Sequence, residues 1–304
     1  MTINRSNHAK QLLPGLNAIF GSAYGSIDGE HTVLFEKETS KRSFEEEVMQ
    51  TGLGEAPVKT EGAAIAYDSY QESYVARYVH QTIALGFNIT EEAVEDDLYK
   101  THSKIAAEGL GRSMASTKQV RAANIFNTAF STNGGDGVPL FSASHPTIAA
   151  GNQSNLGTGD ISETTLETAL INISLFKDDR GILIGAQAKS VHIPPQLQFV
   201  IDKILSSTYS TTVFTDNTAY ATNVNDVNSV GKKGLQWYIN HRFTDTDAWF
   251  IKTNVPNSTK YFERVPLSTA MEGDFDTGNM RYKARERYSF GRSDWRGWYG
   301  SAGA

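Results

Sequence analysis

The pattern of apolar and polar residues over the first thirty residues of the chain predicts no core helix or strand. Glycines are scattered through residues 1–30 and the periodicity is weak, which is typical of an arm that lies on another surface and not of a core element. Residues 31–37 predict a short strand. Residues 40–52 predict a polar, partly helical step that ends at Gly52. The N-terminal fifty residues therefore predict an arm followed by the beginning of a folded body.

Alternating residues with regularly placed tyrosines follow in residues 54–78. Pro57 and Gly62 stand in the first half of this stretch. The pattern predicts a long β-hairpin that projects from the body, with proline and glycine in its proximal half. Residues 80–89 predict a strand that follows the hairpin directly.

A helical pattern begins after Thr90, a candidate N-cap followed by acidic residues that suit the positive end of the helix dipole. Apolar positions recur, with gaps, from Glu91 to about Phe130, and Gly109 and Gly111 predict a kink or interruption. A helix of about 40 residues spans roughly 60 Å. A compact domain of this mass has a radius of gyration of about 19 Å. The helix therefore favours a flat, elongated subunit over a globule.

The second half of the chain predicts a smaller mixed α/β domain, entered through a long loop rich in glycine, asparagine and serine at residues 131–160. The tail, residues 280–300, predicts a strand of unusual length. Between them we expect, in order, a helix at 162–176, a strand at 189–195, a helix at 196–207, an exposed loop at 208–234, and strands at 236–243 and 248–254.

Composition and charge exclude several classes of protein. The chain has no Cys, which removes disulfides and thiolate chemistry, and we expect a soluble protein of a reducing compartment. Its 28 Lys and Arg against 34 Asp and Glu give a net charge of −6, which argues against a dedicated nucleic-acid binder. The polar N-terminus lacks the apolar segment of a signal peptide, and no apolar stretch approaches the roughly 20 residues of a membrane span.

The sequence predicts no catalytic, cofactor-binding or metal-binding residue. Gly109-Leu110-Gly111 lacks the rest of a dinucleotide motif, and the glycine-rich segment 133–137 is better explained as a turn than as an anion cradle. Asp178-Asp179 is better explained as a solvated face than as an acid–base pair. Seven histidines stand far apart with no metal-ligand spacing: His8, His31, His80, His102, His145, His192 and His241.

One charge pattern carries geometry. Arg281, Lys283, Arg285 and Arg287 recur at period two, so in a strand all four side chains project from one face. We call these four residues the basic stripe. Three hypotheses stay open for its counter-charges: an acidic edge of another subunit, an ion-pair network within the chain, or a solvated edge strand guarded by charge. The candidate acidic partners form three clusters: Glu45, Glu46 and Glu47; Glu91 and Glu92; and Glu95, Asp96 and Asp97.

Several blocks of the chain resemble a known family. They are ALGFNITEEAVEDDLY (84–99), AANIFNTAF (122–130), PLFSASHP with GNQSN (139–155), DAWFIKTNVPNSTKYFER (247–264) and RERYSFGRSDWRGWYGS (285–301). In this order they resemble the major capsid protein of tailed bacteriophages, with the α+β fold named for phage Hong Kong 97. Within that family, the quoted blocks are most similar to the subgroup typified by the major head subunit of phage Mu. None of these blocks is a catalytic motif.

The resemblance implies a division of the chain. The two segments that grip neighbouring subunits would be the N-arm and the projecting E-loop, and the peripheral (P) and axial (A) domains would form the body. The implied bounds are 1–30 for the N-arm, 31–53 for the start of the P-domain, 54–82 for the E-loop, 83–137 for the P-domain with its spine helix, 138–262 for the A-domain, and 263–304 for the return to the P-domain with the long strand and tail.

The resemblance also implies the function. We expect a structural subunit, not an enzyme, that needs no cofactor and assembles into pentamers and hexamers of an icosahedral head around double-stranded phage DNA. It would act in the virion and assemble in the bacterial host cytoplasm, without membrane contact. Expected partners are other copies of the chain, a portal, possible decoration proteins and a separate scaffolding protein, since the arm begins almost at Met1. The enclosed DNA would be contacted without sequence specificity.

Three further possibilities follow. Some relatives form a Lys–Asn crosslink between subunits, and Lys59 is the only E-loop lysine, although the sequence identifies neither its asparagine nor a catalytic glutamate. An encapsulin-like protein compartment is the alternative function with the same fold. A soluble α/β enzyme is the alternative from a different class; it requires a cleft with convergent titratable groups, which the sequence does not indicate.

Overall fold

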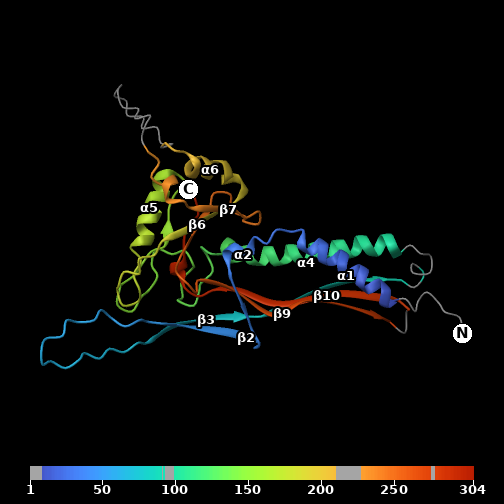
Figure 1. Ribbon diagram of the computed structural model, residues 1–304, viewed down its shortest axis with the longest axis horizontal. Coiled ribbons are helices and arrows are strands. Elements are labelled where there is room, and N and C mark those ends of the chain that lie inside the picture. The colour runs from blue at the N-terminus through green and yellow to red at the C-terminus, as the bar shows by residue number, and fades with distance from the viewer. Residues whose placement is uncertain (1–8, 91, 93–98, 210–226, 275–277) are drawn as a thin grey trace, which may run out of the picture. The chain divides into compact units, whose positions relative to one another are not determined.

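The computed structural model describes residues 9–90, 92, 99–209, 227–274 and 278–304, which form a mixture of helices and strands (Figure 1). The chain divides into two compact units, each made of three separate stretches. Unit 1 comprises Met1–Glu45, Tyr78–Ala122 and Tyr261–Phe290. Unit 2 comprises Glu46–Arg77, Ala123–Lys260 and Gly291–Ala304. Four strands and one long helix continue from one unit into the other.

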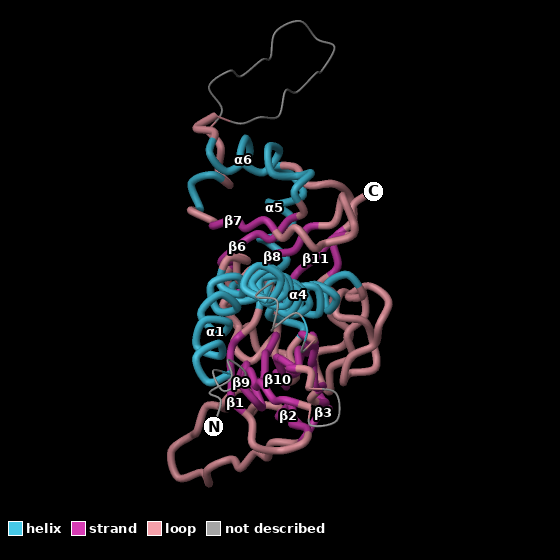
Figure 2. The backbone as a smooth tube through the Cα atoms, turned by 90° about the vertical axis from the view of Figure 1, so that its right-hand side faces the viewer, coloured by secondary structure: helices cyan, strands magenta, loops and turns pink. Residues whose placement is uncertain are grey.

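Unit 1 is a four-stranded sheet covered by helices on one face (Figure 2). The strand order is β1-β9-β10-β4, and β10 pairs with β4 in antiparallel register. The strands are β1 (Glu36–Thr39), β4 (Gln81–Ile89), β9 (Thr259–Gly273) and β10 (Met280–Arg292), and the helices are α1 (Ala9–Gly25), α2 (His31–Leu34) and α4 (Tyr99–Asn127).

The core of unit 1 forms where α1 and α4 meet the inner face of β10. Apolar residues recur at helical spacing on both helices and at period two on the strand, so each element presents one apolar side. The sheet and the two helices therefore bury one common layer. Its members are Leu16, Phe20, Ala107, Leu110, Met114, Tyr282 and Ala284.

Helix α4 is continuous from Tyr99 to Asn127, so the predicted interruption at Gly109 and Gly111 is wrong. Gly111 is instead a point of close approach between two helices. A Cβ atom there would lie 2.7 Å from the carbonyl oxygen of Phe20 and 3.0 Å from Cβ of Ala23. Gly109 meets nothing within 4 Å. The missing side chain of Gly111 therefore serves the packing of α1 on α4.

Three predictions for the N-terminal region are wrong. Residues 9–25 form helix α1, which buries Leu16 and Phe20 in the core of unit 1, although the sequence indicated no core element there. The segment 31–37 contains the short helix α2 before strand β1 begins at Glu36. Most of the partly helical step is strand β2 (Phe44–Gln50), in which exposed and half-buried residues alternate. Pairing of β2 with β3 (Glu72–Val79) outweighs the helix propensity of its glutamates.

Unit 2 contains a five-stranded sheet of order β5-β11-β8-β6-β7 and the two-stranded sheet β2-β3. In the larger sheet β8 is antiparallel to β6 and β11, whereas β6–β7 and β11–β5 are parallel. The strands are β5 (Leu156–Gly157), β6 (Ala188–Ile193), β7 (Gln236–Ile239), β8 (Trp249–Thr253) and β11 (Trp298–Ser301); the helices are α5 (Glu163–Ser174), α6 (Gln198–Ser206) and the 3-10 turns η2 (Pro195–Leu197), η3 (Gly231–Lys233) and η4 (Trp295–Gly297).

Aromatic rings in contact with one another form the centre of unit 2. Phe126, near the end of α4, lies 4.6 Å from Trp298 and 5.4 Å from Phe250, measured between ring centroids. Phe250 also lies 5.2 Å from Phe141. Such offset and edge-on ring pairs stabilise a core by more than their buried area alone.

The predicted helices and strands of this half of the chain are confirmed, except that the strand predicted at 236–243 ends at Ile239. Ser162 caps α5 in a capping box with Thr165. The predicted tail strand is confirmed up to Arg292, where β10 ends; the turn η4 and the short strand β11 follow it. Of the predicted exposed loop at 208–234, residues 210–226 lie outside the described part of the chain.

Candidate assembly surfaces

The segment between β2 and β3, residues 52–71, is the most exposed segment among the described residues of unit 2 and is called here the exposed loop (Figure 1). Thr51 and Gln71 close its base, since the Thr51 N–H donates to the Gln71 carbonyl at 2.9 Å. The loop contains no strand, so the predicted long hairpin is confirmed only at its β3 end and is wrong for residues 54–71. Five of its apolar side chains are largely exposed: Leu53 (57%), Val58 (94%), Ile65 (65%), Tyr67 (93%) and Tyr70 (64%).

These apolar side chains have a physical consequence. Each remains hydrated in the isolated chain, and soluble monomers rarely gather large apolar groups on one exposed segment without a binding role. A loop without paired strands also buries too little of its own surface to stabilise itself. The exposed loop is therefore a candidate contact surface.

The basic stripe lies on the outer face of β10 in unit 1, which confirms the predicted period-two arrangement. Arg281, Lys283 and Arg285 are exposed and Arg287 is half-buried, whereas Tyr282 and the other inward residues are buried. Their partners across the antiparallel pairing to β4 are small or neutral: Asn88, Gly86, Ala84 and Thr82. The side chains of the basic stripe therefore have no large or charged neighbour across the pairing to β4.

Few carboxylates of the described chain meet the stripe. Arg281 forms an ion pair with Asp274, on the turn after β9. Within the described residues, Lys283 and Arg285 form no ion pair, and the buried Nε of Arg287 has no hydrogen-bond partner. Arg287 does act on His80, whose pKa is lowered first by burial and then by this guanidinium, while Glu45 raises it.

The β2 carboxylates have other partners. Glu45 accepts a hydrogen bond from the hydroxyl of Ser40 at 2.6 Å, and Glu46 lies 3.7 Å from Arg77. Glu47 pairs with Lys260. No ion pair joins these glutamates to the basic stripe in the described chain. Of the other predicted acidic partners, Glu92 is exposed, and four lie outside the described residues: Glu91, Glu95, Asp96 and Asp97.

The predicted crosslinking residue, Lys59, is exposed on the loop and has no hydrogen-bonded or ionic partner within the described residues. A crosslink from Lys59 would join two copies of the chain, so it stays a prediction about the contacts between copies.

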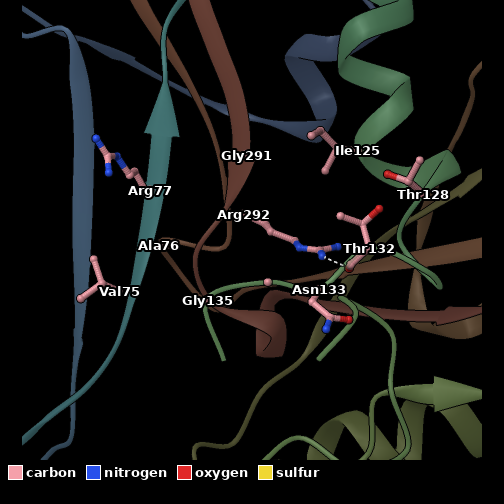
Figure 3. Close-up of a pocket in the computed structure, with 11 residues that line it drawn as sticks. Val75, Ala76, Arg77, Ile125, Thr128, Thr132, Asn133, Gly135, Gly291 and Arg292 are labelled. Atoms are coloured by element: carbon pink, nitrogen blue, oxygen red, sulfur yellow. Dashed lines mark hydrogen bonds between the residues drawn. The ribbon is translucent and has the colours of Figure 1, made fainter. Parts of the chain in front are cut away.

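A cavity of about 380 Å³ opens in unit 2 between β3, the end of α4 and the turn at residues 132–135 (Figure 3). Its charged lining residues are Arg77, which pairs with Glu46, and Arg292, which donates to the carbonyl of Thr132. Neither a carboxylate nor a histidine lines the cavity. The site lacks the convergent acid and base groups of a hydrolytic or transfer reaction.

A buried ion pair in unit 1 was not found by sequence reasoning. The Lys118 ammonium on α4 lies 2.8 Å from Oε2 of Glu286 on β10 and 2.8 Å from the Tyr24 hydroxyl of α1. The rings of Tyr24, Tyr261 and Tyr288 surround it at 5.2 to 5.6 Å. Burial raises the pKa of Glu286, and Lys118 opposes that shift. These contacts join both helices to the sheet.

A second buried network, in unit 2, was also missed. The Arg296 guanidinium pairs with Asp179 and with Asp294, at 3.3 Å from the latter, and donates to the carbonyl of Lys177 at 2.8 Å. All three charged side chains are less than a tenth exposed. Burial raises the pKa of Asp294 and Arg296 opposes the shift. Asp179 is thus a core residue, and the prediction of a solvated face was wrong for it.

His145 and Asn155 come from the quoted blocks PLFSASHP and GNQSN. Their side chains are hydrogen-bonded to each other in unit 2. Asn155 donates from its amide nitrogen to the carbonyls of Leu140 and Trp298 at 2.8 and 3.1 Å, which orients its oxygen toward Nε2 of His145 at 3.0 Å. Nδ1 of His145 lies 2.6 Å from Asp136. The role of these blocks is therefore to close the long loop on the aromatic core.

The described residues contain neither a candidate metal site nor a candidate membrane-spanning helix. No group of three or more His, Asp or Glu side chains in that part of the chain is placed to hold a metal ion. None of its helices combines the length and apolarity that crossing a bilayer requires.

Comparison with known proteins identifies the class. The family model described as phage capsid protein matches residues 74–301, which is more than half of the chain. The chain therefore belongs to the phage capsid protein family, and it is a shell protein by that membership. No curated protein matches the chain.

Solved structures show the same fold. The capsid of an empty GTA particle is 11% identical over 90% of this chain and 90% of that one, with a TM-score of 0.54. The SrpI encapsulin complex from Synechococcus elongatus PCC 7942 is 10% identical over 90% and 87%, with a TM-score of 0.53. The bacteriophage JBD30 capsid is 10% identical over 88% of this chain, which spans only 64% of that chain, with a TM-score of 0.46. The fold is thus shared by the capsid of the GTA particle and by the SrpI encapsulin.

Proposed function

We propose that this chain is the major capsid subunit of a tailed phage, which self-assembles into pentamers and hexamers of an icosahedral head around double-stranded DNA. The observation that carries the proposal is the exposed loop, whose five apolar side chains lack cover in the single chain. Membership of the phage capsid family supports it. A shell of many copies lets each weak loop contact add to a large total.

The finer assignment forms part of the proposal. We assign the fold to the Hong Kong 97 type and the sequence to the Mu-like group of head subunits. The N-arm is 1–30, the E-loop 54–82, the A-domain 138–262, and the P-domain contains the rest of the chain. A scaffolding protein, a portal and decoration proteins are the proposed partners, and assembly takes place in the host cytoplasm.

The basic stripe is proposed as a contact between copies. Two of its cations, Lys283 and Arg285, are exposed without an ion pair in the described chain. The glutamates of β2 already have partners, so the acidic segment from Glu91 to Asp97 of a neighbouring copy is the favoured source of counter-charge. Opposite surface potentials of this kind set the register and rate of association more than its strength.

An encapsulin-like compartment is the second candidate, and the structural likeness to the SrpI encapsulin favours it. The two candidate functions differ in what the shell encloses. A phage head encloses DNA and an encapsulin encloses a protein cargo.

The experiment that tests the function is expression of the chain with and without its neighbouring genes, followed by sedimentation and electron microscopy. We expect pentamers, hexamers, tubes or shells. A strictly monomeric protein at high concentration, with scaffold supplied, would contradict the proposal. Nuclease-protected DNA in shells made with portal and packaging genes supports the phage head, whereas a co-purifying protein cargo supports the compartment.

The stripe has its own test. Arg285→Glu with Arg287→Glu should leave the melting temperature of the isolated subunit unchanged and block assembly, and reversal of Glu95 and Asp96 to lysine should restore it. Normal assembly of the double variant at low and high salt would show a merely solvated strand face. Unfolding of the isolated subunit would show a network within the chain.

A further inference from the structure

The two legs of the exposed loop are tied together at Asp68. Its carboxylate accepts hydrogen bonds from the N–H of Gly54, on the opposite leg, and of Ser69, both at 2.8 Å. The segment enclosed by this tie, residues 55–67, is called here the distal loop, and it turns at Gly62, where φ is +79°. Asp68 therefore closes the distal loop at its base, and these N–H donors, with Arg180, lower its pKa.

Arg180, from another part of unit 2, forms an ion pair with Asp68. This ion pair is called here the junction. Nη2 of Arg180 lies 2.8 Å and 2.7 Å from the two carboxylate oxygens of Asp68. Both side chains are partly exposed, at 24% and 41%. A Cβ atom at Gly54 would lie 3.2 Å from Asp68 and 3.4 Å from Arg180, so the glycine leaves room for the junction.

The turn that carries Arg180 is closed by hydrogen bonds of its own. Asp178 accepts from the N–H of Arg180 and of Ile182, both at 2.9 Å, and Gly181 adopts a positive φ of 91°. Lys177 and Leu183 form a β-bridge across it. This Asx-type turn fixes the backbone from which Arg180 extends.

The same turn is anchored in the core of unit 2. Asp179, between the turn aspartate and Arg180, is 5% exposed and pairs with the buried Arg296. Its carbonyl also accepts from the N–H of Ala149 at 2.9 Å. Asp178 therefore shapes the turn, Asp179 anchors it in the core, and Arg180 reaches the exposed loop.

We propose that Arg180 is a positioning residue, and that its pairing with Asp68 holds the distal loop in the direction in which its apolar side chains meet a second copy of this chain. The second half of this statement rests on the proposed function. Without the junction, the two legs have only the Thr51–Gln71 closure behind them, and residues 55–67 sample many directions. An oriented loop loses less conformational entropy on docking, so the junction speeds and strengthens assembly.

The absence of cysteine makes the first test direct. Spin labels on Thr60→Cys, at the loop tip, and Thr168→Cys, on α5, report the direction of the loop within unassembled unit 2 without background labelling. We expect a narrow distance distribution in the otherwise native chain, a broad one with Arg180→Ala or Asp68→Ala, and an intermediate one with Arg180→Lys, which keeps the charge but loses the planar fork. Lys189→Ala removes an exposed cation elsewhere in unit 2 and should leave the distribution narrow. Equal widths in all variants would overturn the proposal.

The second test is the rate of assembly measured by light scattering. Arg180→Ala and Asp68→Ala should slow it by about threefold to tenfold, the range expected for one partly exposed ion pair that orders a loop, while Lys189→Ala should match the native rate. A broadened loop with an unchanged rate would overturn its role in docking. If the native chain never assembles, the proposed function fails, while the label distances still decide whether Arg180 directs the loop.

Discussion

The two units bury charge in different ways. In unit 1 the compact ammonium of Lys118 meets one carboxylate and lies among tyrosine rings, which leaves Oε1 of Glu286 without a hydrogen-bond partner among the described residues. In unit 2 the planar guanidinium of Arg296 serves two aspartates and a backbone carbonyl at once. The stability lost on removing a buried cation depends on how many buried partners it leaves unpaired. Removing Arg296 should therefore destabilise its unit more than removing Lys118.

The sequence offers a convenient way to follow the units separately. All four tryptophans, Trp237, Trp249, Trp295 and Trp298, belong to unit 2. Tryptophan fluorescence therefore reports the unfolding of unit 2, and amide exchange along α4 before residue 123 reports unit 1.

The largest effect is expected for Arg296→Met. It leaves two aspartates, each 5% exposed, without their cation, and should lower the free energy of unfolding of unit 2 by about 5 kcal/mol. Urea unfolding followed by tryptophan fluorescence measures the loss. Arg296→Lys should cost less, since one ammonium keeps part of the charge pairing. An unchanged fluorescence midpoint in the methionine variant would contradict the comparison.

The next effect is expected for Lys118→Met in unit 1. One buried carboxylate, Glu286, loses its partner, and the local stability of α4 should fall by about 3 kcal/mol in amide exchange. Adding Glu286→Gln should recover much of the loss, because the remaining side chain carries no charge. Exchange along α4 that is the same in all three proteins would show that the pair contributes nothing to unit 1.

A pH titration separates the units further through His192 in β6. Burial, and secondarily Lys252, lower the pKa of His192 from 6.5 to about 3. A lowered histidine pKa stabilises the fold above pH 6.5, and this contribution is lost as the pH falls toward 3. Unit 2 should therefore lose roughly 1.4 kcal/mol per pH unit in that window from this group. Its fluorescence midpoint should fall accordingly, and His192→Gln should flatten the slope; a native slope in the glutamine variant would exclude His192 as the cause.

Glu286 acts in the opposite direction in unit 1. Its pKa is raised by burial, so the contribution of this carboxyl is fully present below pH 4.5 and is lost as the pH rises through its folded value. The pH dependence of α4 exchange in Glu286→Gln, compared with the native chain, isolates that contribution. Acidification thus weakens unit 2 through His192 while this carboxyl favours unit 1.

The sequence predicts features that depend on a local pattern and misses features that depend on contacts between distant residues. The basic stripe could be predicted because period two fixes its geometry in any strand, and β10 confirms it. The helix of residues 162–176 could be predicted from its cap and spacing. Strand β2 could not, since Glu45, Glu46 and Glu47 favour a helix locally and only pairing with β3 makes them alternate.

The candidate surfaces follow the same rule. The exposed loop could be located from proline, glycine and tyrosine, but its lack of strand pairing depends on contacts across the fold. The Asp68–Arg180 junction joins residues separated by 112 positions, and no local spacing announces it. Asp178-Asp179 did stand out as a pair, and the error lay in treating two neighbours as equivalent when one shapes a turn and the other is buried.

The smallest effects come from two glycines of α4 and decide whether helix packing, and not only the buried ion pair, holds unit 1 together. Gly109 is exposed and nothing lies within 4 Å of its missing Cβ, so Gly109→Ala should stabilise unit 1 by about 0.5–1 kcal/mol through helix propensity. Gly111→Ala should destabilise it by about 1–3 kcal/mol, because the new methyl group would meet the α1 backbone at 2.7 Å. Amide exchange along α4 measures both variants under the same conditions. A gain in stability from Gly111→Ala would mean that α1 does not pack on α4 as described.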